Sequence, residues 1–185
     1  MKPAVIMLDM AKGYGDAASW GHDFMARVRR LKDAAHAAGV PVIHVHSMRR
    51  PTDNLPGRRH MLVGSDDLEV LPELQPTEQD IIIYKRYLSG FSYNDLDYTL
   101  RTMERDTVII TGGSTDNTVL WTSADAFQHR YQVVVVSDCT KVHRAAETHE
   151  STIRHESALR IIREVLHSEV LTLDEVLAKY LLTPV

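Results

Sequence analysis

The sequence has almost no cysteine and no long hydrophobic run. Its single cysteine, Cys139, excludes an intrachain disulfide, and we therefore expect a reducing, cytoplasmic compartment. The apolar stretch in MKPAVIMLDM is only a few residues long, which predicts a first strand rather than a signal peptide. No run approaches the roughly 20 apolar residues that span a bilayer, so we expect no membrane partner.

An excess of positive charge is also missing. The formal net charge is −4 and the lysines and arginines are scattered, which argues against a nucleic-acid-binding surface. Hydrophobic residues make up 44% of the 185 residues, enough to bury one sizeable core. We therefore expect a single domain spanning residues 1–185.

Short β-branched runs such as IIIY and VVVV alternate with segments of helical periodicity. That alternation predicts an α/β fold, a three-layer α/β/α sandwich whose six-stranded parallel sheet carries helices on both faces. Strands are predicted to start near Ala4, Val40, Asp80, Thr107, Gln132 and Glu169. The first helix is predicted over residues 23–39 and ends at Gly39, and the second over 92–103, beginning at Ser92. A third helix is predicted to begin with a cap at Thr115 or Asp116. The last two are predicted over residues 145–166 and from Asp174 onward.

The segment from residue 47 to 79 is rich in proline and glycine and long for a connection in a compact domain. Its length predicts short helical turns or a functional role. Arg49, Arg50, Arg58 and Arg59 are candidates for binding a substrate carboxylate, although solvated surface is the commoner explanation for such arginines.

Ligands of open parallel sheets bind outside the carboxyl ends of the strands, so strand-end residues are the site candidates. The predicted strand ends carry Asp9, His44, His46, Lys85, the turn from Gly112 to Thr118, Asp138 and Cys139. A carboxylate, an ammonium and a hydroxyl, from Asp9, Lys85 and Thr118, make the chemically most useful set. Cys139 is more readily interpreted as a small buried hydrophobic residue than as a nucleophile.

Three stretches resemble the isochorismatase-like hydrolase superfamily, which includes nicotinamidases, N-carbamoylsarcosine amidases and isochorismatases. AVIMLDM resembles the first strand with its catalytic aspartate, at Asp9, and YKRYLSGFSYNDLDYTLR resembles the stretch with the catalytic lysine, at Lys85. VIITGGSTDNTVLWTSADAF resembles the family turn Gly-x-x-Thr-Asp/Asn-x-Cys-Val. The likeness runs over nearly the whole chain.

The sequence departs from the family pattern at the nucleophile, because the family's cysteine falls on Thr118, and Ala11 and Gly13 replace a glutamine and an aspartate. A threonine hydroxyl ionises far less readily than a thiol, which disfavours the amidase mechanism of the family. Isochorismatases cleave a vinyl ether without a covalent nucleophile, so the resemblance favours that chemistry here. The alternatives are a non-catalytic relative that keeps the pocket for binding, and an amidase-type enzyme whose nucleophile is replaced by Thr118.

The resemblance implies catalytic roles for Asp9, Lys85 and Thr118, with Thr118 either lining the pocket or acting as nucleophile. A purely structural role, with the Thr118 hydroxyl bonded to the helix backbone, is the competing interpretation. The substrate-binding residues expected from it are Tyr14, His46, Phe91, Gly113 and Ser114. A non-proline cis peptide is expected between Gly113 and Ser114.

No cofactor and no metal are expected. His44, His46 and His60 could together bind a metal, but packing or substrate contact is favoured because the companion Asp-x-His pattern is absent. A homodimer or homotetramer is expected, because relatives associate and because one small core does not need all of Trp121, Phe127, Tyr131 and the helix from Ala145.

Overall fold

In a computed structural model of the chain, described here for residues 1–53, 60–142 and 148–181, six parallel strands form one sheet in the order β3-β2-β1-β4-β5-β6. The strands are β1 (Pro3–Leu8), β2 (Val42–Ser47), β3 (Ile81–Lys85), β4 (Thr107–Gly113), β5 (Gln132–Lys141) and β6 (Glu169–Leu171). Each starts within two residues of its predicted position, so the predicted α/β fold with a parallel sheet is confirmed.

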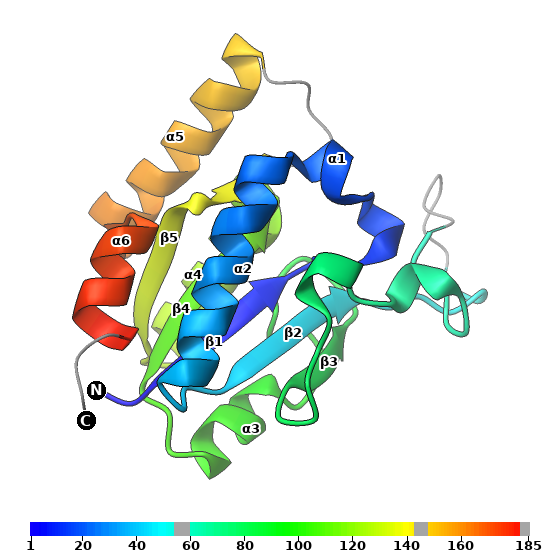
Figure 1. Cartoon of the computed structure of the whole chain (residues 1–185), viewed down its shortest axis with the longest axis horizontal. Helices are drawn as coiled ribbons and strands as arrows, with labels where there is room; N and C mark the ends of the chain where they lie inside the picture. The colour runs from blue at the N-terminus through cyan, green and yellow to red at the C-terminus, as the bar shows by residue number, and fades with distance from the viewer. Residues whose placement is uncertain (54–59, 143–147, 182–185) are drawn as a thin grey trace.

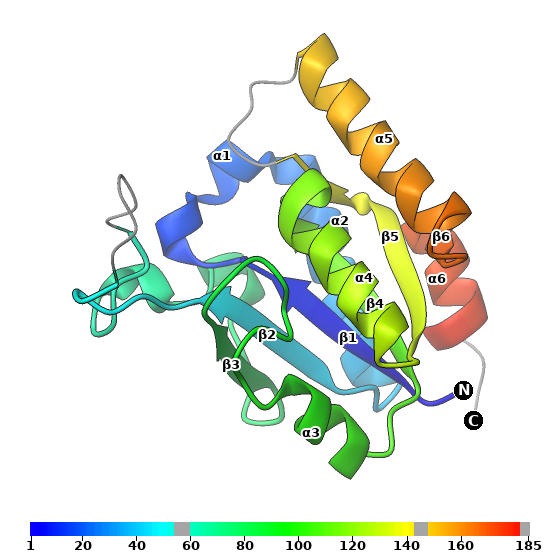
Figure 2. The same ribbon diagram turned by 180° about the vertical axis from the view of Figure 1, so that it is seen from behind.

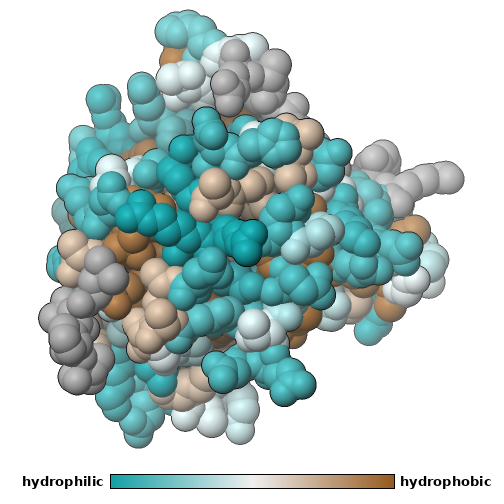
Figure 3. Space-filling model, in the orientation of Figure 1, coloured by the Kyte–Doolittle hydropathy of each residue, from teal (hydrophilic) through white to brown (hydrophobic). Residues whose placement is uncertain are grey.

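Helices cover both faces of this sheet (Figures 1 and 2). One face carries α2 (His22–Ala37), α6 (Leu173–Val176) and the π-helical turn η5 (Leu177–Leu181), and the other carries α3 (Leu96–Thr102), α4 (Leu120–Gln128) and α5 (His149–Glu164). A short helix, α1 (Ala17–Trp20), precedes α2. Hydrophilic side chains cover most of the face that α2 presents, with smaller hydrophobic patches between them (Figure 3).

Residues alternate between the two cores along each strand, as a sheet buried on both faces requires. In β1, Val5 and Met7 pack into the core under α2, whereas Ala4, Ile6 and Leu8 pack into the core under α4 and α5. No helix among the described residues is long and apolar enough to cross a membrane.

The direction of strand addition reverses next to β1, because β2 and β3 follow on one side and β4 to β6 on the other. In open α/β sheets this reversal opens a crevice at the carboxyl ends of the two central strands. Here those strands are β1 and β4, so the fold places the residues after Leu8 and after Gly113 side by side.

The connection between β2 and β3 contains two 3₁₀ turns, η2 (Asp66–Leu68) and η3 (Pro72–Leu74), as its length predicts. One isolated bridge, Ala11 with Val70, ties the connection to the segment after β1, and a second, Arg49 with Leu62, joins two parts of the connection itself. A further 3₁₀ turn, η1 (Lys12–Tyr14), follows β1. Arg58 and Arg59 lie outside the described residues.

Several of the predicted helix starts were wrong. Ser92 does not open α3, which begins at Leu96 after a turn in which the Asn94 side chain donates to Gly90 O and accepts from Leu96 N. The last helix is capped by Thr172 rather than started by Asp174, and α5 is capped by Thr148. The predicted start at Ala145 lies outside the described residues.

The predicted cap at Thr115 or Asp116 was also wrong. These residues lie inside a π-helical turn, η4 (Thr115–Val119), which leads directly into α4 and has no side-chain cap. The Asp116 carboxylate instead accepts from Ser114 Oγ at 2.6 Å and from Arg154 Nε of α5 at 2.6 Å. These contacts tie α5 to the turn after β4.

Candidate active site

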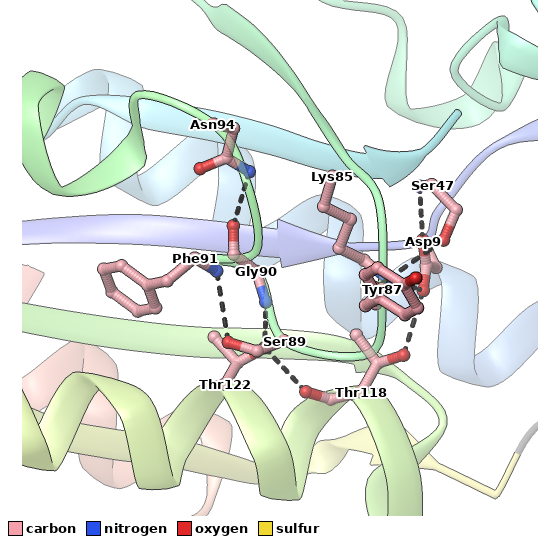
Figure 4. A network of polar contacts seen from close by, with 10 residues as sticks. All are labelled: Asp9, Ser47, Lys85, Tyr87, Ser89, Gly90, Phe91, Asn94, Thr118 and Thr122. Atoms are coloured by element: carbon pink, nitrogen blue, oxygen red, sulfur yellow. Dashed lines mark hydrogen bonds and ion pairs between the residues drawn. The ribbon is translucent and has the colours of Figure 1, made fainter. Parts of the chain in front are cut away.

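Asp9 follows β1 directly and lies at the centre of a buried polar cluster (Figure 4). Its backbone adopts φ of 55°, in the left-handed region that residues with a Cβ seldom occupy and that is over-represented at functional sites. The side chain is almost completely buried, and Oδ1 accepts a hydrogen bond from Ser47 N at 3.0 Å. Its second oxygen, Oδ2, faces the other two groups of the cluster.

Lys85 ends β3 and brings an ammonium group to Asp9. Its Nζ lies 3.0 Å from Asp9 Oδ2 and donates to Ser47 Oγ and to Tyr87 O, each also at 3.0 Å. Lys85 is only 1% exposed, and three partners match the three hydrogens of its ammonium group. A buried ion pair is tolerated where the remaining hydrogen bonds are satisfied in this way.

The third group is the hydroxyl of Thr118, in η4. Its Oγ1 donates to Asp9 Oδ2 at 3.0 Å, across 109 residues of sequence. The structural interpretation, in which this hydroxyl bonds to the helix backbone, does not describe the contact observed. Asp9, Lys85 and Thr118 therefore come together as predicted, around one carboxylate oxygen.

The turn after β4 approaches β1 so closely that only glycine fits at Gly112. A Cβ there would lie 2.2 Å from Leu8 O, and φ is 109°. The peptide bond between Gly113 and Ser114 is cis, as predicted. The Ser114 side chain is directed to Asp116, so of the turn residues it is Thr118 that extends its side chain to Asp9.

Two residues of the cluster were missed by sequence reasoning, Ser47 and Thr122. Ser47 ends β2 and is paired with Lys85 in the sheet, so the strand-end rule could have found it. Thr122 Oγ1 donates to Thr118 O at 2.6 Å and accepts from Gly90 N at 2.8 Å (Figure 4). It thereby joins the loop after β3 to the helix that carries Thr118.

Tyr14, in η1, lies beside the carboxylate. Burial raises the pKa of its phenol far above the ordinary value, and the negative charge of Asp9 adds to that shift. The phenol therefore stays protonated at neutral pH and interacts with Asp9 and Ser47. Its ring packs edge-on against His60, with the centroids 5.6 Å apart.

The structure does not bring Phe91 to this cluster. Its ring stacks on His129 and Tyr131, with centroids 5.1 and 6.0 Å away, and points away from Asp9 (Figure 4). Asp138 and Cys139, which were predicted at a strand end, lie inside β5, and neither side chain contacts the cluster. Asp138 Oδ1 accepts from Leu173 N, and burial raises the pKa of the Cys139 thiol, which disfavours the reactive thiolate.

His44 and His46 lie side by side on β2, facing the core under α2. Both are completely buried. Within the described residues none of their ring nitrogens forms a hydrogen bond, although His44 Nε2 lies 3.6 Å from Asp80 Oδ2. Burial lowers the pKa of His44 to about 4 and that of His46 to about 3. His46 offers no exposed surface to a ligand, and the described residues contain no group of three His, Cys, Asp or Glu side chains placed to hold a metal ion.

The fold is an open α/β sheet with an aspartate and a lysine at strand ends near the β1–β4 reversal. The sequence model of the isochorismatase domain matches residues 3–164, and the chain belongs to that family of hydrolases.

Relatives and solved structures agree with this assignment. The chain is 25% identical to maleamate amidohydrolase of Pseudomonas putida, over 82% of this chain and 78% of that protein. The crystal structure of an isochorismatase-like hydrolase from Alkaliphilus metalliredigens matches with a TM-score of 0.81 and 26% identity, covering 97% of this chain and 99% of that one. N-carbamoylsarcosine amidase from Thermoplasma acidophilum matches with a TM-score of 0.78 and 28% identity, covering 94% and 98%.

Proposed function

We propose that the protein hydrolyses a small molecule at the Asp9–Lys85 pair without a cysteine nucleophile, and that the bond cleaved is a vinyl ether. The observation that carries this proposal is the hydrogen bond from Thr118 Oγ1 to Asp9 Oδ2. A hydroxyl stands where the family resemblance puts a thiol, and the aspartate and the lysine are both retained. The reaction must therefore rely on proton transfer and charge more than on covalent attack.

Cleavage of a vinyl ether suits these groups. In its protonated form, Asp9 donates its proton to the terminal carbon of the enol ether, and the double bond becomes an oxocarbenium-like centre. Water adds to the adjacent carbon and returns a proton to the Asp9 carboxylate, which leaves a neutral hemiketal. The hemiketal then collapses, which breaks the carbon–oxygen bond and releases an alcohol and a ketone. Lys85, held by Asp9 and Ser47, supports the charge and orientation of the reacting groups.

Amide hydrolysis is the second candidate, and the names of the relatives favour it. Maleamate amidohydrolase and N-carbamoylsarcosine amidase both cleave carbon–nitrogen bonds. In that reaction Asp9 would take the proton of the Thr118 hydroxyl, whose oxygen would attack the carbonyl carbon. The carbon–nitrogen bond would break as Asp9 returns the proton to the leaving amine, and water would then hydrolyse the ester on Thr118. A threonine hydroxyl ionises reluctantly and its χ1 is stiff, so this route needs a much stronger base than a thiol does.

The two candidates are separated by a substrate panel. Steady-state rates of the parent protein are measured on small enol ethers and on small primary amides, and hydroxylamine is added to trap any acyl ester on Thr118. Turnover of enol ethers with no hydroxamate product supports the proposal. Turnover of amides with a trapped adduct supports the second candidate, and binding without turnover of either series supports a non-catalytic relative.

The substrate is proposed to contact Tyr14 together with the turn at Gly113 and Ser114.

We also propose that residues 1–185 act as one domain that forms a homodimer or homotetramer in the cytoplasm. Trp121 and Phe127 on α4 are 52% and 45% exposed, which supports association through the α4 side, whereas Tyr131 is buried and does not contribute. A mass near 20.9 kDa by light scattering would refute the association.

A further inference from the structure

Arg49 is a buried arginine that forms no ion pair with any carboxylate of the described residues. It is 7% exposed, and within the described part of the chain its side chain donates one hydrogen bond, from Nη1 to the backbone oxygen of His60 at 2.8 Å. Asp67, one of the carboxylates of the same connection, accepts a hydrogen bond from Met61 N. Arginine stays charged in proteins, and burying an uncompensated charge is costly, so the guanidinium is suited to receive an anion.

The backbone fixes Arg49 beside the Asp9 cluster. It follows Ser47, the residue bonded to both Asp9 and Lys85, by two positions. Its own backbone N donates to Met61 O and its O accepts from Val63 N, each at 2.8 Å, in the bridge with Leu62. Hydrogen bonds on both sides of the residue make this a fixed position rather than a free loop.

Contacts through His60 and Tyr14 link Arg49 to the Asp9 cluster. Arg49 Nη1 bonds to His60, whose ring packs edge-on against Tyr14, and Tyr14 interacts with Asp9 and Ser47. The charge of Arg49 is close enough to oppose that of Asp9 in its effect on the Tyr14 phenol. Asp9 and Lys85 form an ion pair with each other, so neither of them neutralises the charge of Arg49.

We propose that Arg49 binds a carboxylate of the substrate, so that the substrate class is small organic acids whose hydrolysable bond lies beside Asp9. This inference rests on the proposed function of the Asp9–Lys85 pair, and it restricts the substrates of that function to anions. The planar guanidinium pairs with a carboxylate through two parallel hydrogen bonds, which also orients the molecule.

The neighbouring arginines serve as matched controls. Arg50 is exposed and lies one residue further along the chain. Arg86 already holds Asp53 with NH2, 2.7 Å from Oδ1, and donates from NH1 to Met48 O. Neither combines burial with an unneutralised charge, so Arg49 is distinguished from both.

The test is calorimetric binding of two matched series: ω-amido acids of two to five carbons, and the neutral diamides of the same lengths. The parent protein should bind at least one amido acid about tenfold or more tightly than its diamide. Arg49→Gln should abolish that preference while leaving diamide binding unchanged, and Arg50→Gln should keep it. Arg49→Lys, which retains the charge but not the planar fork, should keep part of the preference.

Thermal unfolding of each variant shows whether it folds. If Arg49→Gln does not fold, the loss of acid preference in Arg49→Lys is the test. An undiminished preference in Arg49→Gln would overturn the inference, as would equal binding of acid and diamide, or no binding of either, by the parent protein. Because binding is measured, a failure of the proposed chemistry leaves this comparison intact. Conversely, turnover of neutral substrates without dependence on Arg49 would refute the anion site alone.

Discussion

Thr118 donates its hydroxyl hydrogen to Asp9, with Oγ1 3.0 Å from Oδ2, the same oxygen that lies 3.0 Å from Lys85 Nζ. A hydroxyl and an ammonium therefore share one oxygen of a single carboxylate. A carboxylate shared in this way is held in place by both partners, and the hydroxyl is one of its fixed neighbours. The chemistry at Thr118 and the integrity of the ion pair can be tested separately.

Replacing Thr118 with cysteine should alter which bonds are cleaved. Thr118→Cys should not accelerate cleavage of an enol ether, because no covalent step is required there. It should introduce slow hydrolysis of small amides, because a thiol beside Asp9 ionises far more readily than a hydroxyl. The measurement is the rate on both substrate series, with Thr118→Ser as the control. A faster enol-ether reaction in Thr118→Cys would contradict the expectation.

Removing the lysine should destabilise the fold as well as the reaction. Lys85→Met leaves the carboxylate of Asp9 buried without its counter-ion, which typically costs about 3–5 kcal/mol. Adding Asp9→Asn should recover much of that loss, because the uncompensated charge is then gone. Urea unfolding of the two single variants and the double variant measures this coupling. Fully additive losses would show that the ion pair does not determine stability here.

The buried histidines should make the fold sensitive to acid. Their folded-state pKa values, about 4 for His44 and about 3 for His46, lie below the ordinary 6.5, so the unfolded chain binds protons first as the pH falls. Their contribution is complete above pH 6.5 and is lost progressively between pH 6.5 and about 4 to 3, by up to about 1.4 kcal/mol per pH unit for each histidine.

The experiment compares the free energy of unfolding between pH 7 and 4.5 in the parent protein, in His44→Phe with His46→Phe, and in His22→Gln as an exposed control. The double variant should lose most of the acid-dependent slope above pH 4.5, and His22→Gln should keep it. Equal slopes in all three proteins would show that these histidines do not govern acid stability.

The hydroxyl of Thr122 should matter more than its small size suggests. Thr122→Val keeps the shape but removes the bonds to Thr118 O and Gly90 N, and leaves that N–H buried without its partner, at a cost of about 1–3 kcal/mol. Ser123→Ala, on the same helix, is the matched control, because its hydroxyl bonds only to the backbone oxygen of Val119. Similar denaturation midpoints for the two variants would count against a specific role of Thr122.

The sequence was enough to predict that Asp9, Lys85 and Thr118 lie close together. Parallel strands present their carboxyl ends at one edge of the sheet whatever their order, and the same rule would have identified Ser47. The contacts of Thr122 could not be predicted, because they join two connections through side-chain orientations that no spacing encodes.

Phe91 shows the limit of transferring a role by motif position. It lies next to Gly90, which is bonded to the cluster, but its ring faces the opposite way and stacks on His129 and Tyr131. Helix starts were misplaced for a related reason. Asn94 and Asp116 have several nearby partners, and only the folded arrangement decides which one each side chain takes.

The central claim is that Asp9 transfers the proton and Thr118 is not a nucleophile. It is tested most directly by comparing kcat/KM of Asp9→Asn and Thr118→Ala on the best substrate of the parent protein. Asp9→Asn keeps the shape and removes the proton-transfer group, so it should lose about 10²- to 10⁴-fold, whereas Thr118→Ala should lose less than about tenfold. Equal losses in the two variants, with an acyl adduct trapped on Thr118 of the parent protein, would contradict the account.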